Sequence, residues 1–345
     1  MPAARGKAGD LASVTVMGGG IFGLACAWEM TRRGAHVRVI EARHIGAGAS
    51  GGHVGALAPH APDNWNDKKA FQLDSLLMAP DFWAEVEQAS GLPSGYRRTG
   101  RLQPVTNAPA LQTRIDAATS RWPEPIGMRL LGDPQSPLAR PGCWLQDDLT
   151  ARLNPKSALT ALAGAIRARG GEVIEGQTAT PTGPTLWATG IDGLDALNDS
   201  AGRSIGKGVK GQSALLDFAL PDSPQIFTDG LYIVPHDDGT TAIGSTSENE
   251  FTHDRPDDQL TDLIARARGL CPALADAPVI DRWAGIRPRA RSRAPLLGAW
   301  PGRTDQYVAN GGFKIGFGMA PKIAAIIADL ILDGKDTIPQ DFRLS

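Results

Sequence analysis

The chain has 345 residues, with 37 Asp and Glu against 35 Lys and Arg and a formal net charge of -2 at pH 7. This length allows one large two-lobed domain or two domains, and the near-balanced charge argues against a protein that binds nucleic acid through overall electrostatics. Three widely separated cysteines and no long apolar run, at the N-terminus or elsewhere, indicate no disulfide framework, zinc site, signal peptide or membrane span. We therefore expect a cytoplasmic protein with structural thiols.

The first predicted elements form a strand-helix-strand unit. Residues 14–17 read as a buried strand, residues 21–33 as a helix that Gly34 ends, and residues 36–40 as a second strand. The turn before the helix, GGGIFG, matches G-x-G-x-x-G at Gly18, Gly20 and Gly23. Such glycines permit a tight turn, let the backbone approach a pyrophosphate, and let the helix pack on the strand, while the helix N-terminus offers free N–H groups.

The residues after this unit favour one dinucleotide over another. Glu41 ends the second strand, where an acidic side chain hydrogen-bonds a ribose hydroxyl and disfavours a 2′-phosphate. A second stretch rich in glycine and small residues, RHIGAGASGGHVGAL at 43–57, follows the acid directly. An NAD site does not need this stretch, whereas a flavin site can use it along the pyrophosphate and the isoalloxazine. We therefore predict FAD.

The rest of the chain mixes two kinds of pattern. Asn154 and Pro155 are an N-cap and a first helical residue, opening a helix to Arg169 that stops at two glycines. Strand-like residues 172–174 and 186–188 return the chain to the nucleotide domain. Stretches 61–144 and 212–283 carry short segments typical of antiparallel strands. Residues 257–270 are a predicted helix at one edge, and 319–334 a C-terminal helix.

These patterns predict an α/β fold with α+β elements, in which a Rossmann-like FAD-binding domain is joined to an antiparallel-sheet substrate domain. Both domains are discontinuous in sequence. The FAD-binding domain is predicted to take residues 12–60, 145–207 and 284–345, and the substrate domain residues 61–144 and 208–283.

At this point the chain resembles the glycine oxidase and D-amino acid oxidase family of FAD-dependent amine oxidoreductases, which also includes the sarcosine oxidases. Segments in the family's order carry the resemblance: 14–42, 46–59, 186–190, 208–217, 231–248, 283–298 and 307–331. The resemblance implies the two-domain arrangement described above, with the substrate-domain sheet covering the flavin ring. No cysteine stands where covalently flavinylated sarcosine oxidases attach their cofactor, so we expect non-covalent FAD.

The resemblance also implies the cofactor contacts, residue by residue. They are Gly18, Gly20, Ile21, Phe22 and Gly23 in the turn; Glu41 and Ala42; Ser50, Gly52, His53 and Val54; Ala188, Thr189 and Gly190; and Gly312, Lys314, Ile315 and Gly316. The loop 312–316 begins the last helix, whose backbone donors and dipole would stabilise negative charge at the flavin pyrimidine edge.

Three residues are predicted by the same resemblance to act on the substrate. Arg287 matches the arginine that grips the substrate carboxylate with its planar fork, and Tyr232 matches a tyrosine lining that pocket. Lys314 lies in NGGFKIGFG, a departure from the usual glycine oxidase loop that is more similar to sarcosine oxidases, where a lysine contacts the carboxylate. The alternatives are a surface arginine, a core tyrosine and a lysine facing solvent. Two cations together would suit a dianionic substrate.

The predicted reaction is oxidation of the C–N bond of glycine, sarcosine or a D-amino acid by hydride transfer to flavin N5, giving an imine that hydrolyses. Oxygen, a quinone or a protein then accepts the electrons. One alternative is an enzyme like the tRNA wobble-uridine-modifying oxidases; another is a flavin-binding subunit in a heteromer without turnover of its own. His53 and His60 either tune amine protonation or are ordinary polar residues. Arg289, Arg291 and Arg293 form either a solvated basic edge or a site for an anionic tail or partner.

Overall fold

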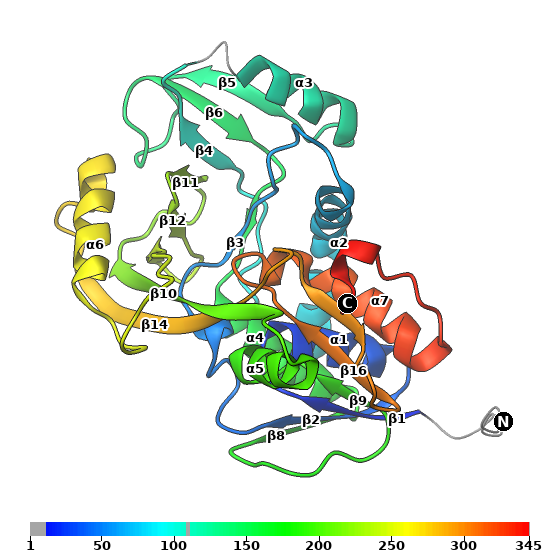
Figure 1. The fold of residues 1–345 in the computed structure, drawn as a ribbon. Coiled ribbons are helices and arrows are strands. Elements are labelled where there is room, and N and C mark those ends of the chain that lie inside the picture. Colours follow the sequence, from blue (N-terminus) through cyan, green and yellow to red (C-terminus); the bar gives the residue numbers. More distant parts are fainter. Residues whose placement is uncertain (1–11, 108–110, 345) are drawn as a thin grey trace.

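The computed structural model describes residues 12–107 and 111–344, and one half of it is built on a mostly parallel sheet (Figure 1). The strand order is β15-β16-β9-β1-β2-β8, and only β15 runs antiparallel, to its neighbour β16. The strands are β1 (Ser13–Met17), β2 (His36–Glu41), β8 (Glu172–Glu175), β9 (Thr185–Trp187), β15 (Leu296–Ala299) and β16 (Gln306–Asn310). The carboxyl ends of β1, β2, β9 and β16 therefore meet at one edge.

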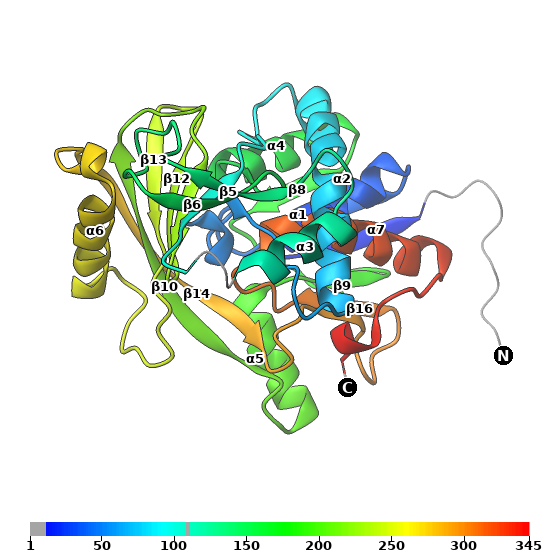
Figure 2. The ribbon, with the colours of Figure 1, turned by 90° about the horizontal axis from the view of Figure 1, so that it is seen from above.

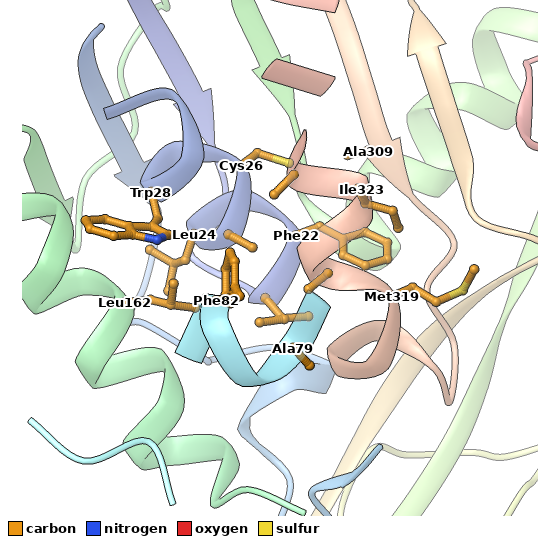
Figure 3. Packing of buried hydrophobic residues seen from close by; sticks show 14 of the residues in the cluster. Phe22, Leu24, Cys26, Trp28, Ala79, Phe82, Leu162, Ala309, Met319 and Ile323 are labelled. Atoms are coloured by element: carbon orange, nitrogen blue, oxygen red, sulfur yellow. The ribbon is translucent and has the colours of Figure 1, made fainter. Parts of the chain in front are cut away.

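Helices cover both faces of this sheet. The helices are α1 (Ile21–Arg32), α2 (Asp67–Ser90), α4 (Pro155–Ala168), α5 (Gly190–Ala201) and α7 (Gly316–Asp333). Neighbouring residues of β16 point to opposite faces: Ala309 packs in the core with α1, α2, α4 and α7, and Val308 packs with α5. Figure 3 shows the larger core, in which Phe22 of α1 lies among residues of α2 and α7.

The helix ends confirm the predicted signals. Asn154 caps α4 by accepting a hydrogen bond from the Ser157 N–H at 3.2 Å, and Pro155 follows at the first helical position. Gly34 follows α1 with φ of +92°, and Gly334 ends α7 with φ of +67°, both in the left-handed region that glycine adopts without strain. Cys26 of α1 and Cys271 are fully buried, as expected of structural thiols, whereas Cys143 is exposed.

The second half is a twisted sheet in the order β14-β10-β13-β12-β11-β4-β6-β5, antiparallel throughout except for β11 and β4. Its strands are β4 (Arg101–Pro104), β5 (Met128–Gly132), β6 (Cys143–Asp147), β10 (Gly206–Asp217), β11 (Gln225–Thr228), β12 (Leu231–Pro235), β13 (Thr240–Gly244) and β14 (Val279–Ala290). A short ladder joins β3 (Ala56–Leu57) to β7 (Ala151–Arg152). The predicted combination of a Rossmann-like sheet and an antiparallel sheet is confirmed.

Helix α6 (Asp258–Leu270) forms where a helix is predicted, but it does not lie at a sheet edge. Leu260, Leu263 and Ile264 pack into the core beneath strands β10 to β13, so α6 covers one face of the large sheet. Figure 2 shows α6 on the side of that sheet that faces away from α1, α2 and α7. An apolar stripe at helical spacing identifies a buried face, but it does not identify which surface covers it.

The stretch 61–144 contains more helix than its pattern predicts. Helix α2 fills much of it, and α3 (Gln112–Arg121) follows, where we expect antiparallel strands. Asn66 caps α2 by accepting from the Lys69 N–H at 3.1 Å, and Pro80 lies inside the helix. One face of α2 is buried against α4 and α7, but apolar residues such as Met78 and Ala84 also lie on its exposed face, so its sequence shows no clear apolar stripe.

The proposed domain division stays a proposal. Two of its boundaries fall inside the long strands β10 and β14, which pair along their whole lengths, and α2 packs with the helices of the parallel sheet. Within residues 12–107 and 111–344, no helix is both long enough and apolar enough to cross a membrane.

Candidate active site

A cavity of about 460 Å³ lies where the carboxyl ends of the parallel strands face the large sheet. Strands β1, β2 and β16 end in it at Met17, Glu41 and Asn310, and Ala188, which directly follows β9, also lines it. In open α/β sheets this crevice is where ligands bind, and the volume is within the roughly 300–1,000 Å³ of small-molecule pockets.

The glycine turn forms one wall of the cavity. Gly18 has φ of +109°, and a Cβ atom there would lie 2.5 Å from the Ala188 carbonyl oxygen. Gly23 packs directly on the Gly18 carbonyl, so a side chain at Gly23 would also displace the turn. Gly20, at the N-cap of α1, makes no side-chain cap, while Ser50 Oγ accepts a hydrogen bond from the Ile21 N–H at 3.1 Å. The turn therefore presents backbone to the cavity at a helix N-terminus, which fits a pyrophosphate.

Glu41 is held in place beside this turn. Its carboxylate accepts hydrogen bonds from the Gly19 N–H at 2.7 Å and the Arg43 N–H at 2.9 Å. These two donors fix the half-buried side chain at the cavity wall. A ribose hydroxyl is the group that such a carboxylate, at the end of the second strand, is suited to bind.

The structure brings nearly all of the predicted site residues to this one cavity. The predicted residues that line it are Gly18, Gly20, Ile21, Phe22, Glu41, Ala42, Ser50, Gly52, Val54, Ala188, Thr189, Gly190, Tyr232, Arg287, Gly312, Lys314, Ile315 and Gly316. The two exceptions are Gly23, which packs behind the turn, and His53, whose ring lies against Ser213 and Asp281. These residues come from both sheets, so the cavity is assembled by the tertiary fold.

Arg287 projects from β14 and is 7% exposed. Its guanidinium lies over Gly211 of the neighbouring strand β10, and its Nη1 donates a hydrogen bond to the Thr246 carbonyl oxygen at 3.1 Å. Within residues 12–107 and 111–344, no carboxylate lies within 4.0 Å of this guanidinium. Burial lowers the pKa of Arg287 to about 10, partly offset by the charge of Glu248, so the side chain is a buried cation at neutral pH.

The nearest acid, Glu248, is held by other residues. The Glu248 carboxylate lies 3.3 Å from Lys210 Nζ and accepts a hydrogen bond from Gln212 Nε2 at 2.8 Å. Lys210 also pairs with Asp257, and Thr246 Oγ1 donates to Glu248. These partners hold Glu248 out of direct contact with Arg287, so the guanidinium keeps N–H donors that a ligand in the cavity can use.

Lys314 adds a second cation to the same cavity. Partial burial, together with the charge of Arg287, lowers the pKa of Lys314 to about 8, although its side chain still reaches solvent. Phe313 precedes it in the left-handed region with φ of +45°. Its ring is near two cations, with Lys314 Nζ at 5.8 Å and Arg289 Cζ at 5.5 Å from the ring centroid. Since Arg287 and Lys314 repel each other, an anion bound between them would relieve an existing cost.

Tyr232 lines the cavity with its ring, and its hydroxyl interacts with Arg101. The ring packs on Phe227 with centroids 4.5 Å apart. Arg101 is itself buried and paired with Asp147, Nε to Oδ2 at 2.8 Å. Burial raises the pKa of Tyr232, so the phenol stays neutral. This placement favours a wall of the substrate space over a carboxylate donor.

Sequence reasoning missed several residues of the cavity wall, among them Ser213, Ser245, Phe227 and Trp283. Ser213 and Trp283 are directly opposed in the β10 and β14 ladder, and Gly52 leaves room for the Trp283 ring, 3.0 Å from where a Cβ would lie. Trp283 opens one of the segments that carry the family resemblance, so a signal for it existed. Ser213 and Ser245 also lie within such segments, 208–217 and 231–248, whereas Phe227 lies outside them and is placed by its pairing with Tyr232 in the β11 and β12 ladder.

The basic cluster Lys207, Arg289, Arg291 and Arg293 lines a second, shallower cavity of about 310 Å³. Arg289 Nη2 donates to Asn249 Oδ1 at 2.8 Å, and Arg291 Nη1 donates to the Ser204 carbonyl at 3.4 Å. The cluster adjoins the main cavity where Arg289 meets Phe313.

Comparison with known proteins places this arrangement among flavoproteins. The family described as DAO, FAD dependent oxidoreductase, matches residues 13–330. The bifunctional protein ThiO/ThiG of Synechocystis sp. is 30% identical, over 93% of this chain and 52% of that protein. A glycine oxidase of Geobacillus kaustophilus is 25% identical, over 94% of this chain and 93% of that protein. The chain thus spans about half the length of the bifunctional relatives.

Solved structures share the fold. Iminodiacetate oxidase from Chelativorans sp. BNC1 superposes with a TM-score of 0.85 at 21% identity, covering 96% of this chain and 98% of that one. The crystal structure of glycine oxidase from Geobacillus kaustophilus gives a TM-score of 0.84 at 22% identity, with the same coverage of 96% and 98%.

Proposed function

The chain belongs to the DAO family of FAD dependent oxidoreductases, and from this premise we propose that it oxidises the C–N bond of a small amino acid or N-methyl amino acid. The observation that carries the proposal is the buried guanidinium of Arg287, which faces the cavity without a carboxylate partner among residues 12–107 and 111–344. A buried cation without a counter-ion is costly, and a ligand carboxylate removes that cost.

FAD is the cofactor of the family, and the residues of this cavity fit it. The pyrophosphate would lie on Gly18, Gly20 and the start of α1, with Glu41 on a ribose hydroxyl. The loop 312–316 at the N-terminus of α7 would face the other end of the cofactor, where its dipole favours negative charge. When bound, FAD supplies the acceptor for the hydride that leaves the substrate carbon, and the resulting imine hydrolyses in water.

The side chains of this chain bind and orient the substrate. Arg287 would hold the carboxylate through two parallel N–H donors. Its hydrogen bond to the Thr246 carbonyl oxygen and its packing over Gly211 fix the orientation of the guanidinium. Lys314 would share the same anion. The rings of Tyr232 and Trp283 would bound the space for the substrate side chain. Orientation of this kind is what such chemistry asks of the protein.

Glycine is the first substrate to test, because curated relatives that match nearly the whole chain are named glycine oxidase. The experiment is an anaerobic visible spectrum of the FAD-loaded protein with glycine, sarcosine, proline and a panel of D-amino acids. Bleaching of the oxidised flavin by one of these, and not by methylamine, supports the proposal. A flavin that none of them bleaches overturns it and favours a subunit without turnover.

A second candidate follows from the charge of the cavity. Arg287 and Lys314 are two cations in one cavity, and neither forms an ion pair with a carboxylate among residues 12–107 and 111–344. A secondary amine with two carboxylates would balance both charges. Iminodiacetate therefore belongs in the same panel, and a lower apparent KM for iminodiacetate than for glycine or sarcosine would identify a dicarboxylic substrate.

A further inference from the structure

A chain of hydrogen bonds leads out of the cavity through residues that the proposed substrate contacts do not use. Ser213 of β10 lines the cavity and is 2% exposed. Its Oγ lies 3.2 Å from Nδ1 of His53, and His53 Nε2 lies 3.1 Å from Oδ2 of Asp281. His53 is 3% exposed, whereas the Asp281 side chain is 47% exposed. The chain therefore runs from the cavity wall through a buried imidazole to the protein surface.

A carboxylate such as that of Asp281 only accepts hydrogen bonds, so a neutral His53 ring that contacts it carries its proton on Nε2. The backbone N–H of His53 donates to Ser213 Oγ at 3.3 Å, so the single hydroxyl proton of Ser213 is free to point at His53 Nδ1. Nδ1 then accepts, and Nε2 carries the proton that it donates to Asp281. Ser213 Oγ keeps one further lone pair, which a donor in the cavity can use.

The surroundings of His53 keep its ring neutral, so that it has a nitrogen free to accept a proton. Burial lowers the pKa of His53, partly opposed by its hydrogen bond to Asp281, so the ring is neutral at pH 7. Lys156 of α4 lies 3.2 Å from Asp281 Oδ2 and also lowers the pKa of His53. His236, which follows β12, is buried and itself has its pKa lowered to about 4, so it stays neutral. Asp281 is thus the acid that would stabilise a protonated His53.

We propose that Ser213, His53 and Asp281 form a proton relay that deprotonates the substrate ammonium and passes the proton to solvent. This inference rests on the proposed amine oxidation, because an amine must lose its proton before its carbon can give up a hydride. The ammonium gives one proton to Ser213 Oγ while the Ser213 hydroxyl proton moves to His53 Nδ1. His53 becomes an imidazolium beside Asp281, and its Nε2 proton then passes to water at the exposed carboxylate. This leaves the neutral ring as the Nδ1–H tautomer, which returns to the Nε2–H tautomer before the next turnover. The substrate becomes a neutral amine, and no electrons move.

The test compares FAD-loaded wild type with His53→Gln, Ser213→Ala and Asp281→Asn. The rate of anaerobic flavin reduction by the best amine is measured from low to high pH. In His53→Gln, the new glutamine can still form hydrogen bonds, but it cannot accept a proton and pass it on. The rate of flavin reduction at neutral pH therefore falls by roughly a hundredfold. The difference between the rates of wild type and His53→Gln becomes smaller as pH rises. Below the pKa of the amine, the fraction of neutral amine in solution grows about tenfold per pH unit, and neutral amine does not need the relay. Asp281 is the exposed member of the relay, so Asp281→Asn should fold and can replace His53→Gln in the test if that variant does not fold.

The control is His60→Gln. His60 lies in the next connection, between β3 and α2, and its ring is hydrogen-bonded to Gln72 rather than to Ser213. This variant keeps the wild-type pH profile. A second readout needs no turnover: nitrogen NMR of the FAD-loaded protein shows His53 as the Nε2–H tautomer, and Ser213→Ala shifts its Nδ1 signal.

The outcomes separate the relay from the proposed function. Both the proposed amine oxidation and the relay are supported if an amine reduces the wild-type flavin and if the pH profile of His53→Gln differs from that of His60→Gln. The same wild-type result with an unchanged His53→Gln profile, or an Nδ1–H tautomer, overturns the relay and leaves amine oxidation standing. A wild-type flavin that no amine reduces overturns the proposed function, and with it the relay.

Discussion

The guanidinium of Arg287 occupies the space over Gly211 that a Cβ atom would fill. The two residues lie on adjacent strands, β14 and β10, whose ladder pairs Gly211 with Gly285 and Val209 with Arg287. The missing side chain at Gly211 is therefore what lets the arginine lie flat against the sheet and turn toward the cavity. This packing ties the position of the substrate anchor to a residue that has no chemistry of its own.

Substitution at this glycine should displace the anchor. In Gly211→Ala the new methyl group overlaps the guanidinium, so Arg287 must move, and we expect kcat/KM for the amine to fall by roughly a hundredfold. FAD stays bound, because Gly211 is not one of the residues proposed to contact the cofactor. Gly132→Ala is the matched control, since a Cβ at Gly132 of β5 meets nothing within 4 Å. Equal activity of the two variants would show that the function of Arg287 does not depend on its packing over Gly211.

The charge of Lys314 should make anion binding depend on pH. With its pKa lowered to about 8, by burial first and by Arg287 second, Lys314 is charged below that pH and neutral above it. The affinity for a carboxylate is therefore full below pH 8 and falls as pH rises through it, by about tenfold for one lost charge-assisted hydrogen bond. Propionate, which offers a carboxylate without an amine, is titrated against the flavin spectrum.

Two lysine variants make this assignment testable. Lys314→Met should bind propionate weakly at every pH and lose the fall near pH 8. Lys322→Met removes a lysine of α7 that pairs with Asp74 outside the cavity, and it should keep the wild-type curve. A Lys314→Met curve that still falls near pH 8 would assign the titration to another group.

The contacts of Tyr232 predict a structural loss when its hydroxyl is removed. In Tyr232→Phe the ring still packs on Phe227, while the buried Arg101 loses one polar neighbour. We expect the free energy of unfolding to drop by about 1–3 kcal/mol, with a change in substrate KM of less than about tenfold. Urea unfolding and steady-state kinetics measure the two effects. A large rise in KM with unchanged stability would instead make the phenol a substrate donor.

Glu41 should contribute to cofactor affinity through its charge. Glu41→Gln replaces the carboxylate at the end of β2 with a neutral amide, and the Kd for FAD should rise by roughly tenfold. Glu172→Gln at the start of β8 is the control, because that side chain is exposed and lies outside the cavity. The measurement is FAD titration into cofactor-free protein. Equal affinities for the two variants would remove Glu41 from the cofactor site.

Much of the cofactor site could be predicted from the sequence because its signals are local. The turn at Gly18 to Gly23, the strand that ends in Glu41 and the cap at Asn154 each lie within a few residues of the structure that they specify. Their physical causes, a positive φ, a close backbone approach and a helix end, leave a mark on residue type.

The parts that could not be predicted depend on contacts between distant segments. Helix α2 carries apolar residues such as Met78 and Ala84 on its exposed face as well as on its buried face, so its sequence shows no single apolar stripe, and strands are expected in its place. Ser213 reaches His53 only because β10 passes beneath the loop after η1 (Ala49–Gly51), and the sequence separation between these residues hides that contact. Strand register, rather than residue type, decides which polar groups meet.

The most direct test of the account is the preference of the flavin for amines that carry a carboxylate. The rate of anaerobic flavin reduction is measured against concentration for glycine and methylamine, in wild type and in Arg287→Ala. Removing a buried charged partner costs at least about 2 kcal/mol, so Arg287→Ala should raise the concentration of glycine needed for half-maximal rate by roughly thirtyfold or more. The variant should keep its FAD and lose the discrimination against methylamine. The account would be contradicted if glycine and methylamine reduce the wild-type flavin equally well, or if glycine still reduces the flavin of Arg287→Ala in preference to methylamine.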